Sequence, residues 1–196
     1  RDSTTCGRMN APPWFWLIAG PNGAGKSTLA SDQYGSLLNI NPDTIARELQ
    51  PDQPGLVTVQ AGRRALEAID AAFARNGNFS VETTLSGKLH IDLMRRARHA
   101  GWSVGLAYIC VENANDAIMR VQERYRRGGH NVRPEDVRRR YDRSLRNLPV
   151  ALRLANVSIL YDNSTASGFL RVLEAQDGTV VYMAGEPPTW LKRALG

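Results

Sequence analysis

Apolar residues fall into two alternating patterns along the chain. Short continuous apolar runs, typical of buried strands, alternate with segments in which apolar residues recur every three or four positions, as on one face of a helix. The predicted strands are residues 14–19, 37–40, 79–83, 103–111 and 157–162. The predicted helices are residues 27–32, 42–49, 56–75, 88–100, 116–126 and 134–154. This alternation predicts a three-layer α/β/α sandwich around a mostly parallel sheet, with right-handed crossovers.

The pattern changes after the last of these strands. Two apolar segments, residues 169–175 and 179–184, flank an Asp-Gly pair, which predicts a β-hairpin. No element is assigned to the closing sequence EPPTWLKRAL. The chain has 196 residues, 42% of them hydrophobic, and is long enough for one well-buried domain, expected over residues 9–196. Residues 1–8 are expected to be an appended or mobile tail outside this fold.

A phosphate-binding loop follows the first predicted strand. The sequence GPNGAGKST, residues 20–28, contains the spacing G-x-x-x-x-G-K-[ST] between a strand and a helix, where a chance glycine-rich turn is disfavoured. The glycines let backbone N–H groups approach phosphate oxygens, Lys26 bridges the outer phosphates, and the Ser27 hydroxyl ligates Mg²⁺. ATP or GTP with Mg²⁺ is therefore the predicted ligand. The predicted nucleotide-binding residues of the loop are Gly20, Asn22, Gly23, Ala24, Gly25, Lys26, Ser27 and Thr28.

Polar residues stand where two further strands end, the edge at which such sheets bind ligands. Asn41 and Asp43 follow the second strand, and Glu82, Thr83 and Thr84 close the third. A carboxylate there accepts the proton of an attacking hydroxyl or positions Mg²⁺ through water. For Asp43, a charge or cap in the first turn of its helix is an equal alternative. Glu82 closes an apolar strand and needs water, a metal or a donor, which favours a functional role.

Positive charge is concentrated in one segment of the chain. The net charge is +6 and the isoelectric point about 9.7. Arginine rather than lysine supplies this charge, which favours planar, bidentate recognition of phosphate. The arginines of the segment are Arg120, Arg124, Arg126, Arg127, Arg133, Arg138, Arg139, Arg140, Arg143 and Arg146.

The arginine-rich segment, residues 120–146, is predicted to be a lid over the nucleotide. Arg120 and Arg124 lie one helical turn apart, so one is expected to stack on the base while the other reaches the phosphates. Gly128-Gly129 is expected to form a flexible break, and the helix after it is expected to bring residues 138–140 back toward the nucleotide. Such a lid excludes water and stabilises the negative charge of the phosphoryl group in transit.

A solvated basic helix face is the alternative for the individual arginines, and it is the expected interpretation of Arg126, Arg143 and Arg146. For His130, a structural or lid-positioning role is favoured over phosphate binding, since a neutral imidazole is a weak anion ligand.

Other features disfavour several classes of protein. No apolar run is long enough to span a bilayer, no signal peptide is recognised, and the two cysteines have no metal spacing, so a reducing cytoplasm is expected. Neither LAYICVE nor SILYD carries the paired Asp-Glu of ATP-driven motors. Only Tyr125 and Tyr141 are interleaved with the arginines, which leaves little stacking platform for nucleic acid.

Several sequence blocks, in order, resemble the zeta toxin family of P-loop kinases. They are GPNGAGKST, NPDTIARELQP, VETTLSG, RVQERYRRGGHNV, RRRYDRSLRNL and YDNS, over residues 14–164. The resemblance implies a nucleotide-kinase-like fold and ATP-dependent phosphorylation of UDP-N-acetylglucosamine on its sugar 3′-hydroxyl. It also implies an antitoxin, encoded elsewhere, as a candidate partner.

The resemblance assigns roles to residues of this chain. The implied catalytic residues are Asp43 as general base, Lys26, Arg120 and Arg124. The implied acceptor-binding residues are Asn41, Asp43, Glu82, Thr83, Arg139 and Arg140, and Asn163 joins the nucleotide-binding residues.

Three hypotheses remain open on sequence alone. The favoured one is a small-molecule kinase, whose acceptor is UDP-N-acetylglucosamine or, because the chain is shorter than the long zeta toxins, another sugar, nucleotide or antibiotic. The second is a kinase or binding protein for nucleic acid, which predicts steep salt dependence. The third is a non-catalytic nucleotide-dependent switch or partner-binding module, in which Asp43 and Glu82 would be dispensable.

Overall fold

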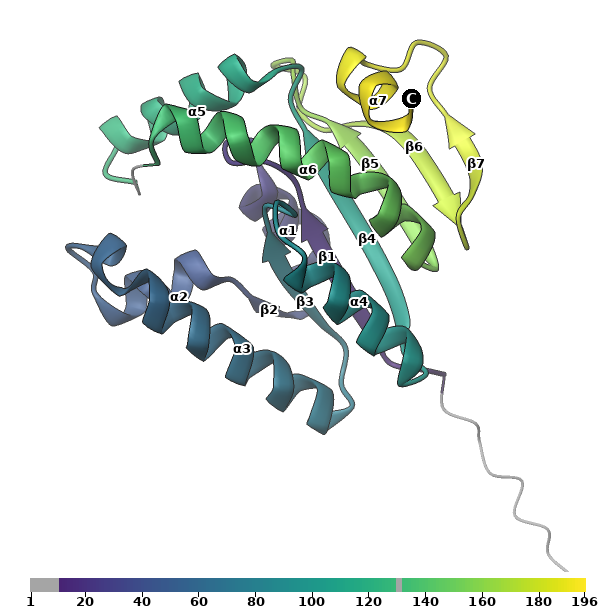
Figure 1. Cartoon of the computed structure of the whole chain (residues 1–196), viewed down its shortest axis with the longest axis horizontal. Coiled ribbons are helices and arrows are strands. Elements are labelled where there is room, and N and C mark those ends of the chain that lie inside the picture. Colours follow the sequence, from purple (N-terminus) through teal and green to yellow (C-terminus); the bar gives the residue numbers. More distant parts are fainter. Residues whose placement is uncertain (1–10, 130–131) are drawn as a thin grey trace, which may run out of the picture.

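A computed structural model of the chain describes residues 11–129 and 132–196 (Figure 1). Its strands form one sheet in the order β2-β3-β1-β4-β5-β6-β7. The strands are β1 (Trp14–Ala19), β2 (Leu38–Ile40), β3 (Phe79–Thr83), β4 (Ser103–Cys110), β5 (Val157–Asp162), β6 (Leu170–Gln176) and β7 (Thr179–Met183). The helices are α1 (Lys26–Tyr34), α2 (Pro42–Leu49), the 3₁₀ helix η1 (Pro54–Val57), α3 (Thr58–Arg75), α4 (Leu89–His99), α5 (Ala114–Arg126), α6 (Pro134–Leu154) and α7 (Thr189–Leu195).

The first five strands pair in parallel, which brings their carboxyl ends to one edge of the sheet. β1 lies between β3 and β4, so the loop after β1 emerges at the middle of this edge. β6 and β7 continue the sheet in antiparallel pairing. The predicted hairpin is confirmed, and its turn residues Asp177 and Gly178 both have positive φ, as a two-residue hairpin turn requires.

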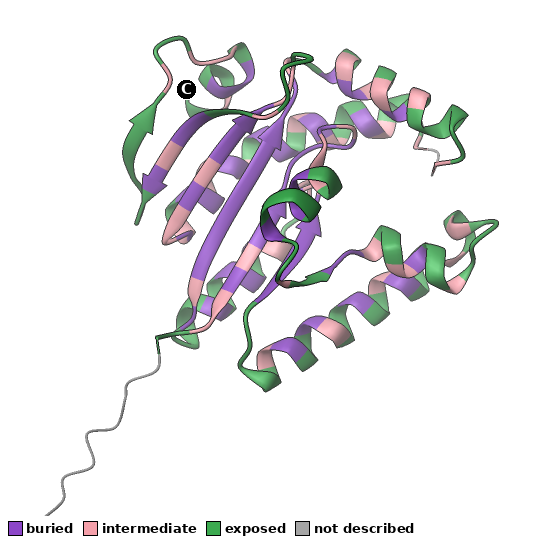
Figure 2. Ribbon diagram, turned by 180° about the vertical axis from the view of Figure 1, so that it is seen from behind, coloured by how far each residue is buried: buried purple, intermediate pink, exposed green. Residues whose placement is uncertain are grey.

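Side chains on the two faces of the sheet enter separate cores. Phe15 and Leu17 of β1 belong to a large core with α3, α4, α5, α6 and α7, whereas Ile18 packs with Leu29 and Ala30 of α1. Figure 1 shows α3, α4 and α6 on the near side of the sheet, and Figure 2, from behind, shows α1 in front of the strands. The predicted three-layer α/β/α architecture is therefore confirmed, with one helix in its thinner layer.

Two short helices differ from the sequence prediction. The predicted helix over residues 56–75 begins instead at Thr58, because the preceding Pro54–Val57 forms the 3₁₀ helix η1. α7 occupies the closing sequence to which no element was assigned. Tertiary packing stabilises it, since Trp190 and Leu191 are each only 1% exposed.

Among the described residues, no helix combines the length and apolar character needed to span a bilayer. The predicted tail, residues 1–8, and His130, for which a lid-positioning role is expected, lie outside the described residues.

Candidate functional site

The loop between β1 and α1 has the backbone conformation that its glycines allow. Gly20 has φ +145° and donates its N–H to the Thr83 carbonyl at 3.2 Å, and a Cβ at Gly20 would lie 2.0 Å from the Ile109 carbonyl oxygen. Gly25 caps α1 with φ +104°. No side chain among the described residues caps the amides of the first turn, so these N–H groups and the positive end of the helix are available to an anion.

A cavity of about 390 Å³ opens over this loop. Its wall combines the loop, the start of α2, the end of β3, the start of α4 and the C-terminal half of α5. The lining residues are Asn22, Gly23, Gly25, Lys26, Ser27, Thr28, Asn41, Pro42, Asp43, Glu82, Thr83, Thr84, His90, Arg120 and Arg124.

Most of the predicted site residues meet in this one cavity, and five do not line it: Gly20, Ala24, Arg139, Arg140 and Asn163. Gly20 and Ala24 are buried within the loop. Asn163, which follows β5, donates from Nδ2 to the Ala24 carbonyl at 2.9 Å and so braces the loop from behind. A contact with the nucleotide stays a prediction for Asn163.

Lys26 is half-buried in the wall of the cavity and donates from Nζ to the Pro21 carbonyl at 2.9 Å. Burial lowers the pKa of its ammonium group to about 8, against the opposing effect of the negative charges of Glu82 and Asp43. Asn22 Oδ1 is buried, and no donor among the described residues reaches it. Both groups are polar, desolvated and incompletely paired, which is typical of a site whose ligand completes the hydrogen bonding.

Glu82 is 6% exposed, and both of its carboxylate oxygens accept hydrogen bonds. Ser27 Oγ donates to Oε2 and Asn39 Nδ2 donates to Oε1, each at 2.8 Å, and Ser80 Oγ donates to Asn39 Oδ1 at 3.1 Å. Sequence reasoning missed Asn39 and Ser80. Each lies in a strand beside apolar residues, and only the parallel register of β2 and β3 brings the two together.

The Ser27 hydroxyl and the Glu82 carboxylate place two oxygen donors side by side in the cavity. Hydroxyl and carboxylate oxygens are the donors that Mg²⁺ prefers, and this ion usually takes its other ligands from water and substrate phosphates. Within the described parts of the chain, no three His, Cys, Asp or Glu side chains gather into a metal site of their own. The donor set therefore fits a cation that binds together with a nucleotide.

Asp43 lies in the first turn of α2, but it is not the helix cap. Asn41 is the N-cap, and its Oδ1 accepts from the Asp43 backbone N–H at 2.8 Å. No described residue donates a hydrogen bond or an ion pair to the Asp43 carboxylate, which lines the cavity and is exposed. Capping therefore does not account for the carboxylate, although a favourable charge at the helix N-terminus remains.

His90 is a site residue that sequence reasoning missed. Its Nδ1 lies 3.0 Å from Thr83 Oγ1, which accepts from the Leu85 backbone N–H at 3.0 Å. The arrangement that satisfies all of these groups has the Thr83 hydroxyl donating to Nδ1, which leaves the ring proton on Nε2. Burial lowers the pKa of His90 to about 4, so the ring is neutral near pH 7. The sequence signal that could have indicated His90 is its position seven residues after Thr83, in the first turn of the next helix.

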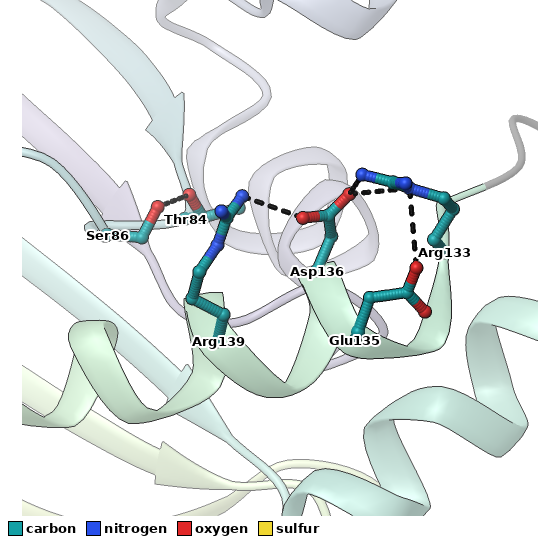
Figure 3. A network of polar contacts seen from close by, with 6 residues as sticks. All are labelled: Thr84, Ser86, Arg133, Glu135, Asp136 and Arg139. Carbon is teal, nitrogen blue, oxygen red and sulfur yellow. Dashed lines mark hydrogen bonds and ion pairs between the residues drawn. The ribbon is translucent and has the colours of Figure 1, made fainter.

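The arginines of residues 120–146 divide into two groups. Arg120 and Arg124 reach the cavity from α5, and neither is in an ion pair with a described residue. Arg139 is exposed and forms an ion pair with Asp136 at 2.7 Å, next to the Arg133–Asp136 pair (Figure 3). Arg140 is half-buried outside the cavity wall. Acceptor binding by Arg139 and Arg140 stays a prediction that this arrangement does not support.

Comparisons with known proteins show the family to which the chain belongs. The family model described as Zeta toxin matches residues 2–184. An uncharacterised protein of Haemophilus influenzae strain Rd is 36% identical over 126 residues, which cover 64% of this chain and 90% of that protein.

Solved structures share the fold. A chain of the AvrRxo1-ORF1:AvrRxo1-ORF2 complex with sulphate ions has a TM-score of 0.65 at 16% identity; the match covers 86% of this chain and 60% of that one. A chain of the PezAT toxin–antitoxin system of Streptococcus pneumoniae has a TM-score of 0.59 at 19% identity, covering 97% and 80%. A putative kinase of Chloroflexus aurantiacus has a TM-score of 0.53 at 17% identity, covering 65% and 79%. On these grounds, the chain belongs to the zeta toxin family of P-loop kinases.

Proposed function

We propose that the protein transfers the γ-phosphate of ATP to a hydroxyl group of a small molecule, with the sugar 3′-hydroxyl of UDP-N-acetylglucosamine as the leading acceptor. One observation carries the proposal: a phosphate-binding loop and an unpaired carboxylate, Asp43, line the same cavity of about 390 Å³. A kinase needs a group that accepts the proton of the attacking hydroxyl, and an unpaired carboxylate in the same cavity as the phosphate-binding loop supplies one.

The donor half of the site is the loop with α1. Backbone N–H groups and Lys26 bind the phosphates of ATP, and charged phosphates favour the ammonium form of this lysine, whose pKa desolvation lowers. The Ser27 hydroxyl and the Glu82 carboxylate would hold Mg²⁺, which supplies charge neutralisation at the outer phosphates when bound. The choice of ATP over GTP rests on the family.

The acceptor half of the site lies between α2 and the loop after β3. Asp43 accepts the proton while the acceptor oxygen bonds to the γ-phosphorus and the bond from that phosphorus to the β–γ bridging oxygen breaks, releasing ADP. Thr83, Glu82 and the Nε2–H of His90 are the groups that orient the acceptor. Their rigid hydrogen bonding to Leu85 and Asn39 keeps these groups in place before the acceptor binds.

Arg120 and Arg124 complete the site from α5. Their unpaired guanidinium groups stabilise the negative charge of the phosphoryl group in transit, and the lid over residues 120–146 excludes water around it. The site and its lid belong to one kinase domain over residues 9–196. An antitoxin is the expected protein partner, and the cytoplasm, which holds ATP, is the expected location.

The test is transfer of radiolabelled γ-phosphate from ATP with Mg²⁺ by the purified protein. The acceptors are UDP-N-acetylglucosamine, other nucleotide sugars, nucleosides and short RNA, with Asp43→Asn as the inactive control. We expect label on UDP-N-acetylglucosamine that the variant abolishes. Label on RNA or another acceptor would overturn the assignment of the acceptor, and the absence of transfer to every acceptor would overturn the kinase proposal.

A further inference from the structure

The loop after β3 contains a buried leucine in a strained backbone conformation. Leu85 has φ +54°, in the left-handed region that favours glycine, although its side chain is 0% exposed. This conformation costs energy in a leucine, because its Cβ lies too close to the following carbonyl oxygen. Strained residues of this kind persist only where surrounding contacts hold them, and they cluster at binding and catalytic sites. The contacts that hold Leu85 therefore show which part of the molecule uses this conformation.

Two side chains hold the peptide groups on either side of Leu85. Its backbone N–H donates to Thr83 Oγ1 at 3.0 Å, and its carbonyl accepts from Asn147 Nδ2 at 2.8 Å. The Thr84 and Ser86 hydroxyl oxygens, 2.8 Å apart, close the turn around it (Figure 3). Because rotation of Leu85 to a negative φ changes the angle between its two peptide groups, such a rotation would break at least one of the two backbone hydrogen bonds.

Asn147 can hold this turn because its own helix is fixed by the core. Leu145 and Leu148 of α6 are 3% and 0% exposed, and they belong to the same large core as Leu85. Burial of the Leu85 side chain supplies no partner for the Leu85 carbonyl, and a buried carbonyl without a donor is unfavourable. The hydrogen bond from Asn147, which is half-buried, therefore links the backbone of the turn to α6.

The same contacts reach the wall of the main cavity, the one of about 390 Å³ over the phosphate-binding loop. Thr83 lines this cavity together with Thr84 and His90. Since Thr83 Oγ1 receives the Leu85 N–H, its own proton is directed to His90 Nδ1, 3.0 Å away, and the ring keeps its proton on Nε2. A chain of hydrogen bonds therefore runs from Asn147 on α6 through this turn to the ring of His90.

We propose that Asn147 is a positioning residue for the acceptor, acting by holding Leu85 in its left-handed conformation. The held turn fixes the Thr83 hydroxyl and the Nε2–H of His90 toward the acceptor. Asn147 lies outside the wall of the main cavity, so it acts through Leu85 and not by contact with a substrate. The consequence for transfer rests on the proposed kinase function, whereas the consequence for the His90 ring does not. The two are therefore measured separately.

The first test follows the His90 ring by nuclear magnetic resonance of the full chain with ¹⁵N-labelled histidine and without substrate. We expect the Nε2–H tautomer to predominate in the wild type at pH 7. Asn147→Ala should shift the tautomer equilibrium at least about threefold toward Nδ1–H, because the Thr83 hydroxyl is no longer held. Asn147→Asp, which has the same size but no donor at this position, makes the same test if Asn147→Ala does not fold.

The matched control for this measurement is Asn156→Ala. Asn156 is also half-buried and accepts from the Val104 backbone N–H at 2.9 Å, but it precedes β5, at the edge of the sheet away from the cavity. We expect the His90 signals, identified by their loss in His90→Gln, to be those of the wild type in this control. Unchanged His90 signals in the Asn147 variants, or an equal change in the control, would overturn the proposal.

The second test separates the acceptor from ATP by steady-state kinetics. We expect Asn147→Ala to raise KM for UDP-N-acetylglucosamine at least about tenfold, with KM for ATP within about threefold of wild type. In a double-mutant cycle, Asn147→Ala should add little to Thr83→Val, because both substitutions interrupt the same chain of hydrogen bonds. Full additivity of the two effects, or an equal rise in both KM values, would refute positioning through Leu85. Absence of transfer in the wild type would count against the kinase function alone, and the His90 signals would still decide the role of Asn147.

Discussion

Asp43 is the residue on which the proposed chemistry depends most. Asp43→Asn keeps the size and polarity of the side chain but removes its ability to accept a proton. We expect kcat to fall by about 10² to 10⁴, the usual contribution of a general base, while ATP affinity stays within about threefold of wild type. Steady-state transfer and nucleotide titration measure the two quantities. The control is Glu48→Gln, a substitution at an exposed residue of α2 outside the cavity wall. If Asp43→Asn is as active as Glu48→Gln, Asp43 is not the general base.

His90 is expected to make the stability of the fold depend on pH. Burial lowers its pKa from 6.5 to about 4 in the folded chain, so below pH 6.5 the unfolded chain takes up a proton that the folded chain does not. This contribution to the free energy of unfolding is fully present above pH 6.5 and is lost as the pH falls toward 4, by up to about 3 kcal/mol.

The measurement is denaturant unfolding between pH 4 and pH 7. We expect His90→Gln to flatten the decline in stability over this window, whereas His99→Gln, an exposed histidine of the same helix, should leave the slope unchanged. Parallel curves for the wild type and His90→Gln would show that the ring is not held neutral.

Among the elements, the turn from β1 into α1 has the tightest backbone requirement. At Gly25, φ is +104°, and an added Cβ would lie 2.7 Å from Asn163 Nδ2, the group that braces the loop. We expect Gly25→Ala to cost about 1–3 kcal/mol of stability through backbone strain and to weaken ATP binding at least about tenfold.

Gly62→Ala is the matched control for this substitution, because it lies inside α3 with no atom near its added Cβ. There alanine should stabilise the helix by about 0.5–1 kcal/mol. Thermal unfolding and nucleotide titration of both variants test the pair, and equal effects at the two glycines would contradict the requirement for this turn.

The elements also show why part of the site was predictable from sequence. The phosphate-binding loop is contiguous, and its chemistry is written in the spacing of residues 20–28. The contact of Glu82 with Asn39 depends on the register of two strands, and the hydrogen bond from Asn147 to the Leu85 carbonyl depends on the packing of α6 against a loop more than fifty residues earlier. α7 escaped prediction because seven residues carry little periodic signal and its stability comes from Trp190. Contiguous motifs could therefore be predicted from the sequence, whereas contacts between distant segments could be found only from the three-dimensional structure.

At the scale of the whole molecule, the positive charge is not one uniform surface. Several arginines form exposed ion pairs, which contribute little to stability individually, whereas Arg120 and Arg124 line the main cavity. Part of the positive charge is thus directed toward a cavity of about 390 Å³, which Lys26, Arg120 and Arg124 line. This distribution favours a phosphate-rich small ligand over a continuous nucleic-acid track.

The C-terminal helix α7 packs on the fold largely through the buried side chain of Trp190. Trp190 packs on Tyr108 of β4 and donates from Nε1 to Asp162 Oδ1 at 2.7 Å, directly before Asn163, which braces the phosphate-binding loop. We expect Trp190→Phe to cost about 1–3 kcal/mol, because it leaves a buried carboxylate with one donor fewer. Trp190→Ala should cost about 3–5 kcal/mol through the cavity it creates.

Denaturant unfolding of the full chain measures both losses, and Trp14→Phe, a half-buried residue at the opposite end of the sheet, is the control, with an expected loss below about 1 kcal/mol. ATP affinity measured well below the unfolding transition separates support of the fold from support of the site. If Asp162 transmits the contact to the loop, Trp190→Phe will weaken ATP binding more than Trp14→Phe does. If the two variants bind ATP equally well but differ in stability, α7 supports the fold and not the site.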